Sequence, residues 1–586
     1  MAVLAASARP TGPLMQKARL TRRTVPEHGP WPPSVPALLQ RIYAARGVLR
    51  PEDAELRLAR LHPPETLSHI DAAVRLLAGA IQANRHIVIV GDFDCDGATG
   101  TAVAVRGLRI LGAARVSYQV PHRITHGYGL SPALVEDMAA LEPDLLVTVD
   151  SGIACHAGVA AAKARGWQVL ITDHHLPGAQ LPSADVIVNP NLDGDAFPSK
   201  ALAGVGVMFY LLLALRRHLR EAGAFAGVEP DLAVLLDLVA IGTVADLVPL
   251  DHNNRLLVSA GIRRMRQGQC QPGVRALAEA AGRSLDRLTA SDIGFAIGPR
   301  LNAAGRIEDM ALGIECLLCD DAVHAGELAS VLDRINAERR DLQQKMVLDA
   351  EALIIELPDD SASASAALCL FDERWHPGVI GLVASRIKDK AHRPTLAFAP
   401  AAPGSDSLRG SARSIPGFHI RDAIAAVDAR HPGLIERFGG HAMAAGLSLP
   451  SANLESFRRL FTAHAQATLT PEQLSSELLS DGPLSADEFT RETAESLLMA
   501  GPWGQGFAEP LFDNVFSVLE WRVLSERHLK FRLQADVGGP ALSAIHFGGW
   551  SGEAPPARIH AAYQLEPDDF RGRRDVQLLV RQWQPA

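Results

Sequence analysis

The chain has 586 residues, and its 57 basic and 66 acidic side chains give a formal charge of −9. Apolar residues make up 47% of the sequence and charged residues 21%, which excludes a largely disordered chain. Six cysteines in this length exclude a disulfide scaffold and favour a reducing, cytoplasmic compartment. The acidic balance excludes a surface that is basic all over, but it leaves room for a local basic groove.

The first half of the chain has the sequence pattern of an α/β domain. Residues 1–50 contain a cluster of prolines and are predicted to form an extended arm that leads into a first helix. Between about 70 and 250, helical segments alternate with β-branched apolar runs at 87–90, 145–149, 169–172 and 186–188. This alternation predicts a parallel sheet covered by helices on both faces, with its functional site at the carboxyl ends of the strands.

No segment predicts a membrane anchor. The apolar start of the chain precedes its basic residues, which is the wrong order for a secretory signal. The longest uncharged stretch, 201–215, is too short to span a bilayer and predicts a buried helix.

The second half changes character twice. Residues 326–357 carry apolar side chains near the helical period and predict one long amphipathic helix, followed by a loop at 359–364. Residues 366–465 again show alternating strand-like and helix-like segments. In 529–533 and 576–580, apolar and polar residues alternate with the period of a β-strand. We therefore predict an α/β fold class, with two α/β domains joined by a long helix and followed by a C-terminal β-barrel or sandwich.

Acidic residues gather where the predicted strands end. The run at 87–90 is followed by three aspartates at alternate positions, Asp92, Asp94 and Asp96, whose charges repel unless a cation neutralises them. Three further apolar runs, all interpreted as strands, end in Asp150, in the triplet 173–175 and in Asp246. Each of these residues alone could be a helix cap, a turn former or a core histidine, but together they predict a metal site.

The ligand types indicate which metal this site would bind. Carboxylates with few imidazoles and no thiolate favour Mn²⁺ or Mg²⁺ over a structural zinc. The number of ligands suits two ions, which would activate a water and stabilise the attacking and leaving oxygens of a phosphoryl centre. The pair Cys316 and Cys319 is a competing metal candidate, but it lies in an apolar, helix-like run without a second cysteine pair.

These motifs resemble those of the DHH phosphoesterases. The matching segments are GDFDCDG at 91–97, VDSG at 149–152 and DHH at 173–175, while GSARS at 410–414 and RFGGHA at 437–442 resemble the associated DHHA1 domain. Further segments are similar to those of the single-strand-specific 5′→3′ exonucleases within this family: PHR at 121–123, AGVGV at 203–207 and IGPRLNAAGR at 297–306. The resemblance runs from about residue 50 to the end of the chain.

The resemblance implies a domain organisation, which we state as an expectation. It comprises an N-terminal arm (1–50), a DHH catalytic domain (51–270), a helical region with the connecting helix (271–357), a DHHA1 domain (358–467) and an OB-fold-like domain (468–586). In the last of these, the basic and aromatic segments 530–532 and 570–574 fit a groove for single-stranded nucleic acid.

The resemblance also implies residue roles. The metal ligands would be Asp92, Asp94, Asp96, Asp150, His174 and Asp246, with Asp150 bridging two ions. His175 would join Asp94, Asp96, Asp150, His174 and Asp246 in the catalytic group. Substrate phosphates, including the 5′ end, would be held by Arg123, Arg306, Ser411 and Arg413, with His122, Arg300 and His441 as further candidates.

The implied activity is the degradation of single-stranded DNA from its 5′ end to 5′-mononucleotides, in DNA repair and recombination. It would use two Mn²⁺ or Mg²⁺ ions in the cytoplasm, without a membrane, and a single-strand-binding protein and a helicase would be candidate protein partners. Two alternatives stay open at this point. One is a phosphoesterase for short oligonucleotides or cyclic dinucleotides, and the other is a non-catalytic single-strand-binding scaffold.

Overall fold

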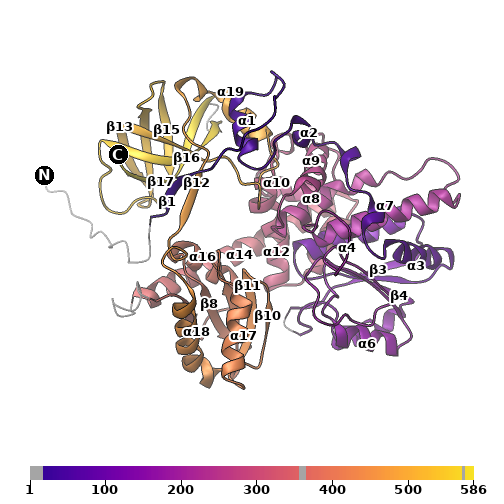
Figure 1. The fold of residues 1–586 in the computed structure, drawn as a ribbon. Helices are drawn as coiled ribbons and strands as arrows, with labels where there is room; N and C mark the ends of the chain where they lie inside the picture. The colour runs from indigo at the N-terminus through magenta and orange to yellow at the C-terminus, as the bar shows by residue number, and fades with distance from the viewer. Residues whose placement is uncertain (1–16, 124, 356–364, 570–573) are drawn as a thin grey trace.

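The computed structural model describes residues 17–123, 125–355, 365–569 and 574–586. Figure 1 shows two α/β bodies and a small β-barrel, with helix α14 (Ala322–Ile355) between the two α/β bodies. The predicted loop at 359–364 and most of the basic cluster at 570–574 lie outside the described residues. None of the helices described in these ranges is long and apolar enough to cross a membrane.

Five parallel strands form the sheet of the first body, in the order β3-β2-β4-β5-β6. Their bounds are β2 (Ile87–Val90), β3 (Val116–Gln119), β4 (Leu145–Val149), β5 (Gln168–Thr172) and β6 (Val186–Val188). All four predicted strands are confirmed, while β3 is an additional edge strand outside the predicted runs. Since the strands run in one direction, their carboxyl ends meet at one edge of the sheet.

Helices cover both faces of this sheet, which explains its uniformly apolar strands. One face packs against α3 (Ile70–Gln82), α4 (Cys95–Ile110) and α7 (Gly204–Glu221), and the other against α5 (Pro132–Asp137) and α6 (His156–Ala164). Helix α7 contains most of the uncharged stretch 201–215 and is largely buried, so the predicted buried helix is confirmed.

The apolar run that ends at Asp246 is a helix, and its interpretation as a strand is wrong. It forms α8 (Leu236–Ala245), in which the first eight residues are all buried. A helix that is apolar on every side has no amphipathic stripe, so periodicity does not distinguish it from a buried strand. Asp246 therefore lies at the C-cap of a helix rather than at a strand end.

A helical region connects the two α/β bodies. It contains α9 (His252–Arg266), α10 (Pro272–Ala280), α11 (Ala290–Asp292), a π-helical turn at Ile293–Ile297, α12 (Gly298–Ile307), α13 (Ala311–Leu318) and α14. The single long helix predicted at 326–357 is confirmed and begins slightly earlier. Cys316 is buried in α13, and neither it nor Cys319 belongs to a group of potential metal ligands among the described residues.

The second body is a mixed sheet in the order β10-β11-β9-β8-β7. Its strands are β7 (Leu368–Phe371), β8 (Thr395–Pro400), β9 (Ser407–Arg413), β10 (Arg437–Gly440) and β11 (Ala444–Pro450). The end of α14 and α16 (Ile380–Ala391) cover one face, while α17 (Ile420–Arg430) and α18 (Leu454–Thr468) cover the other. The predicted α/β class, with two α/β domains joined by a long helix, is thus confirmed.

The C-terminal strands form a closed barrel in the order β13-β14-β15-β17-β16. They are β13 (Phe512–Leu524), β14 (His528–Ala535), β15 (Ala541–His546), β16 (Arg558–Asp568) and β17 (Asp575–Pro585), and α19 (Arg491–Met499) precedes them. The N-terminal arm reaches this region, because β1 (Arg19–Arg22) pairs in parallel with β12 (Glu477–Ser480). After the arm come α1 (Ala37–Ala44) and α2 (Pro51–Ala54), which lead into the first body.

Candidate active site

Asp92 and Asp94 lie in the turn between β2 and α4, and Asp96 lies in the first turn of α4. Asp94 caps α4, since its Oδ1 accepts a hydrogen bond from Gly97 N at 3.0 Å. The carboxylate of Asp96 accepts hydrogen bonds from the backbone N–H groups of Gly204 and Val205, at 2.6 and 3.0 Å, where α7 begins. A Cβ at Gly97 would overlap the backbone of Asp92, so the turn needs glycine there. The N-terminus of α7 thus fixes one of the three carboxylates.

Asp150 follows β4 in a strained backbone conformation. Its φ of +60° lies in the left-handed region that non-glycine residues seldom adopt. The hydroxyl of Tyr128 donates a hydrogen bond to Asp150 O at 2.9 Å, which helps to hold this conformation. Tyr128 is absent from the sequence prediction, although it lies only a few residues beyond the PHR segment.

The triplet after β5 divides its roles between structure and function. Asp173 is buried, and its carboxylate accepts hydrogen bonds from Ile153 N at 2.9 Å, from His174 N at 2.7 Å and from the ring of His175 at 2.8 Å. Burial by itself would raise the pKa of Asp173, but the hydrogen bond and charge of His175 hold it below its usual value. Asp173 therefore orients the two histidines, a role that the sequence prediction does not include.

The two histidines differ in their charge. Burial lowers the pKa of His174, which favours the neutral imidazole that can coordinate a metal ion. Burial also opposes the charged form of His175, but the hydrogen bond and charge of Asp173 raise its pKa to about 9. At neutral pH we therefore expect His174 to be neutral and His175 to be protonated.

The strand ends and α8 bring the acids and His174 together. His174 Nε2 lies 3.0 Å from Asp150 Oδ1 and 3.6 Å from Asp246 Oδ2. The structure contains two groups of three residues whose potential ligand atoms all lie within 4.8 Å of one another inside each group. One group is formed by Asp150, His174 and His175, and the other by Asp96, His174 and Asp246. The shared member is His174. Asp92 and Asp94 lie beside these groups and act on the pKa of Asp150.

We give the name acidic cluster to the group formed by Asp92, Asp94, Asp96, Asp150, His174 and Asp246. Its acids are destabilised as anions. Burial, followed by neighbouring carboxylates, raises the pKa of Asp92 to about 8 and also raises the pKa of Asp96 and Asp150. Within the described ranges, the buried atoms Asp92 Oδ1, Asp150 Oδ1 and His174 Nε2 have no hydrogen-bond partner. Orphaned oxygens and an imidazole nitrogen next to repelling carboxylates fit one or more divalent cations of the Mn²⁺ or Mg²⁺ class.

A second cluster consists of three guanidinium groups and a serine, Arg123, Arg306, Ser411 and Arg413, which we call the arginine cluster. Arg123 Nε donates to Gly305 O at 2.8 Å, and its guanidinium lies 3.8 Å from the centre of the Phe93 ring. Arg413 Nη1 donates to Ser411 Oγ at 3.1 Å, since alternate residues of β9 share a face. A Cβ at Gly381 would lie 2.9 Å from both Arg413 Nη2 and Ser411 Oγ, so the start of α16 faces them.

The arginine cluster carries excess positive charge. Burial and the neighbouring Arg123 and Arg413 lower the pKa of Arg306 to about 9, and burial also lowers the pKa of Arg123 and Arg413. None of the three arginines forms an ion pair with a carboxylate in the part of the chain that the structure describes. Guanidinium groups that repel one another next to a serine hydroxyl suit a phosphate, whose oxygens accept paired N–H donors.

The other three substrate-binding candidates have different environments. Arg300 is buried in the helical region, where Nη1 donates to Ala296 O at 2.7 Å and Nη2 lies 2.7 Å from Asp333 Oδ1. These contacts tie Arg300 to the helical region, and its part in substrate binding stays a prediction. His122 is exposed in the loop beside Arg123, and the ring of His441 stacks on that of His175 with 5.6 Å between centroids.

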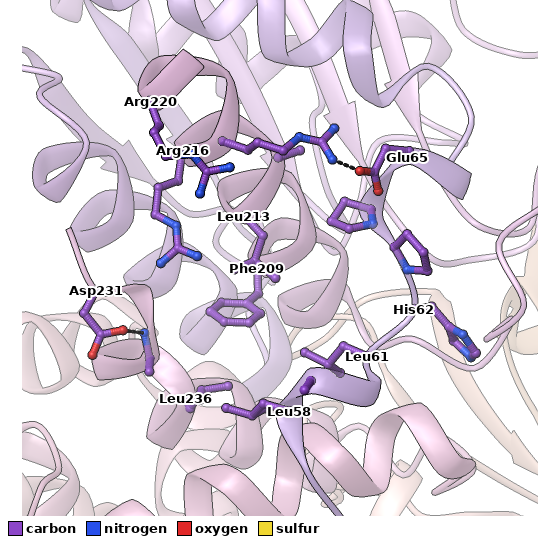
Figure 2. A pocket seen from close by; sticks show the side chains of 16 residues that line it. Leu58, Leu61, His62, Glu65, Phe209, Leu213, Arg216, Arg220, Asp231 and Leu236 are labelled. Carbon is purple, nitrogen blue, oxygen red and sulfur yellow. Dashed lines mark hydrogen bonds and ion pairs between the residues drawn. The ribbon is translucent and has the colours of Figure 1, made fainter. Parts of the chain in front are cut away.

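A hollow elsewhere in the first body is distinct from both clusters. Figure 2 shows its apolar floor, which includes Phe209 and Leu213 of α7. Its volume is about 580 Å³. Arg216 and Arg217 at its rim form ion pairs with Glu229 and Glu65, so their charges are already compensated.

Comparisons with known proteins match both α/β bodies and the C-terminal barrel. Family models match residues 86–243 as the DHH family N-terminal domain, 363–467 as the DHHA1 domain and 480–582 as the RecJ OB domain. The last match confirms the predicted OB-fold-like domain.

Relatives and solved structures give the same result. The single-stranded-DNA-specific exonuclease RecJ of Dickeya dadantii is 51% identical, covering 94% of this chain and 97% of its own. The protein of that name from Escherichia coli is 47% identical, covering 97% and 99%. The crystal structure of RecJ from Thermus thermophilus in complex with Mn²⁺ matches with a TM-score of 0.77 and 32% identity, covering 94% of this chain and 76% of that one. A structure of RecJ from the same source in complex with Mg²⁺ matches with a TM-score of 0.74 and 30% identity, covering 94% and 75%. On this evidence, the chain belongs to the RecJ family.

Proposed function

We propose that this protein is a metal-dependent exonuclease that degrades single-stranded DNA from the 5′ end to 5′-mononucleotides. The observation that carries the proposal is the position of the arginine cluster beside the acidic cluster. The carboxylates of Asp92 and Asp94 act on the pKa of Arg123, so the two clusters are electrostatic neighbours. A phosphate-binding cluster next to a cation-binding cluster suits an enzyme that holds one phosphate and hydrolyses another.

The acidic cluster supports a role for two ions of the Mn²⁺ or Mg²⁺ class. Asp92, Asp94, Asp96, Asp150, His174 and Asp246 would hold them, and the bound ions would activate water and stabilise charge on the reacting phosphate. The N-terminus of α7 holds Asp96 in place. Tyr128 holds the backbone of Asp150, and Asp173 holds the two histidines. Protonated His175 would add positive charge at the side of the site that faces His441.

The arginine cluster supports capture of the 5′-terminal phosphate. Arg123 comes from the first body, Arg306 from the end of α12, and Ser411 and Arg413 from the second body. Two glycines allow these parts to meet, since a Cβ at Gly305 would overlap Phe93 O and a Cβ at Gly378 would overlap Arg306 O. The phosphate site therefore lies at the junction between the two bodies. This position supports a preference for the end of a single strand over a duplex.

The proposal is tested by a polarity assay with purified protein and Mn²⁺ or Mg²⁺. Strands labelled at either end, single and duplex, are digested and the products are separated by length. We expect 5′-labelled single strands to lose their label at once as mononucleotides, while 3′-labelled strands shorten progressively and duplexes persist. Preferred cleavage of dinucleotides would favour the small-substrate phosphoesterase, and binding without cleavage would favour the scaffold.

Several finer points remain part of the proposal. We place the domain boundaries at 51–270, 271–357, 358–467 and 468–586, with the arm at 1–50. The role in DNA repair and recombination and the partnership with a single-strand-binding protein and a helicase stay predictions that rest on the family resemblance. The cytoplasmic location stays a prediction from the cysteine usage of the sequence.

A further inference from the structure

A second hollow lies where the N-terminal segment, the start of α9 and the turn before the barrel meet. Its volume is about 410 Å³, and Asp53, His252, Arg255 and Phe507 belong to its lining. Residues 249–251, in the segment between α8 and α9, form another part of the wall. Within the described ranges, this lining shares no residue with the acidic cluster or the arginine cluster. We call this hollow the Arg255 pocket.

Arg255 brings a buried positive charge to the pocket without the acceptors that normally accompany one. The residue is 6% exposed, and its Nε has no hydrogen-bond partner in the part of the chain that the structure describes. Its guanidinium lies over the ring of Phe507, 4.2 Å from the ring centre. The ring face stabilises the charge but leaves the Nε–H donor unused. A buried donor in this state is costly, which indicates an acceptor that the chain does not supply.

The neighbouring carboxylates are engaged with other groups. Burial lowers the pKa of Arg255, and the charges of Asp251 and Asp53 oppose this shift, so both acids are near. However, the two carboxylate oxygens of Asp251 accept hydrogen bonds from other residues, at 2.8 and 2.6 Å. Asp53 forms an ion pair with Arg50 at 2.9 Å. An additional acceptor for Arg255 therefore has to come from outside the chain.

His252 adds a second nitrogen that needs a partner. It lies three residues before Arg255 on α9, so the two side chains share a face of the helix. Its Nδ1 is buried, and no residue of the described ranges forms a hydrogen bond with it. A carboxylate offers two oxygens in one plane, whereas a phosphate presents oxygens in several directions and can contact both side chains. The pair therefore suits a phosphate group better than a carboxylate.

We propose that the Arg255 pocket is a second phosphate-binding site of this protein, with the Arg255 guanidinium as its main donor. Phe507 supports that guanidinium and is itself stacked on Trp503, with 5.1 Å between ring centroids and an interplanar angle of 11°. This stack fixes the donor before the ligand arrives, so less conformational entropy is lost on binding. In a nuclease, two sources supply such a phosphate: the trailing part of a bound strand and a free mononucleotide.

The test measures phosphate binding to the full-length, metal-free protein by calorimetry. Arg255→Gln removes the charge, and Arg255→Lys keeps the charge without the planar fork. Arg263→Gln changes an exposed arginine of the same helix and is the matched control. All three are made in an Arg413→Ala background, which weakens phosphate binding at the arginine cluster, and circular dichroism checks that each variant is folded.

We expect Arg255→Gln to weaken binding of inorganic phosphate by about tenfold or more, Arg255→Lys to weaken it less, and Arg263→Gln to leave it unchanged. A mononucleotide, a trinucleotide and a long single strand are then titrated against the same variants. A loss confined to the mononucleotide and inorganic phosphate assigns the pocket to free nucleotides. A loss for the long strand but not for the trinucleotide assigns it to the trailing part of the strand.

Unchanged binding of all these ligands to a folded Arg255→Gln variant would overturn the proposal and would leave Arg255 as a structural residue. If Arg255→Gln does not fold, unchanged binding to Arg255→Lys has the same meaning. An equally large loss in Arg263→Gln would also overturn it, because the general charge of α9 would then account for the binding. Inorganic phosphate is bound without any cleavage, so this result is independent of the proposed exonuclease activity.

Discussion

The acidic cluster and the arginine cluster are built in opposite ways. The acids and histidines all come from the first body, where parallel strands and α8 deliver them to one edge of a sheet. The arginine cluster needs a loop of the first body, the end of α12 and β9 of the second body. Each cluster holds buried like charges close together, carboxylates in one and guanidinium groups in the other. Burial together with this repulsion shifts the pKa of Asp150 upward and that of Arg306 downward.

This difference indicates how the two clusters would respond to damage. The acidic cluster is local, so a single substitution there should remove chemistry while the strand still binds. The arginine cluster depends on contact between two bodies, so a substitution there should weaken capture of the 5′ end while the chemistry survives. Substitutions in and around the two clusters test that division, from the largest expected effect to the smallest.

Substitution Asp150→Asn should give the largest effect. It keeps the size of the side chain but removes the carboxylate that lies 3.0 Å from His174 Nε2. We expect cleavage to fall by at least about a thousandfold because several kcal/mol of charge stabilisation are lost. Single-strand binding, measured by fluorescence anisotropy, should remain close to that of the wild type. The exposed residue Asp193 provides the control substitution Asp193→Asn, which should retain full activity. Retained cleavage in Asp150→Asn would remove Asp150 from the metal site.

Substitution Arg413→Ala should act on capture of the 5′ end. Loss of charge-assisted hydrogen bonds worth about 1.5–3 kcal/mol should raise KM for a 5′-phosphorylated strand by roughly 10- to 100-fold. On a strand with a 5′-hydroxyl the same variant should differ much less from the wild type. An equal loss on both strands would mean that Arg413 does not bind the terminal phosphate.

Substitution Arg300→Ala should affect stability instead of catalysis. Removal of this guanidinium deletes its hydrogen bonds to Ala296 O and Ala280 O and its ion pair with Asp333, which should cost about 1–3 kcal/mol of the free energy of unfolding. Thermal or urea denaturation measures this loss, and KM and kcat of the folded variant should stay unchanged at low temperature. A raised KM for 5′-phosphorylated strands would return Arg300 to the substrate site.

The pH dependence of stability should reveal the repulsion between the acids. Burial and neighbouring carboxylates raise the pKa of Asp92 from 3.8 to about 8 in the folded, metal-free protein. The stabilising contribution of its protonated form is complete below pH 3.8 and is lost as the pH rises through about 8. With a chelator present, the Tm should therefore decrease over this range, and Asp92→Asn should decrease less steeply. Parallel pH curves for the two proteins would contradict the raised pKa of Asp92.

The sequence predicts most of the fold because its signals are local. β-branched runs bounded by Gly, Asp or Pro correctly indicate β2, β4, β5 and β6, and the helical period correctly indicates α14. The run before Asp246 misleads, since α8 is apolar on all sides and its period carries no information. Pairing of β1 with β12 joins residues more than 450 positions apart, and no local pattern indicates such a contact.

The two clusters also differ in how far the sequence predicts them. The acidic cluster follows from residue types at successive element ends, and the structure brings these residues together. The arginine cluster follows only from family resemblance, which includes Arg300 although that residue is bound within the helical region. Tyr128 escapes detection because its contact with the site is a hydrogen bond to the backbone oxygen of Asp150, and such a contact has no sequence pattern.

The most direct test of the account is the length of the first product released from a 5′-phosphorylated, 5′-labelled single strand in a single turnover with Mn²⁺. If the arginine cluster holds the terminal phosphate and the adjacent acidic cluster hydrolyses the next one, that product is a mononucleotide. A dinucleotide or longer fragment as the first product would contradict the account, because the two clusters would then not hold consecutive phosphates.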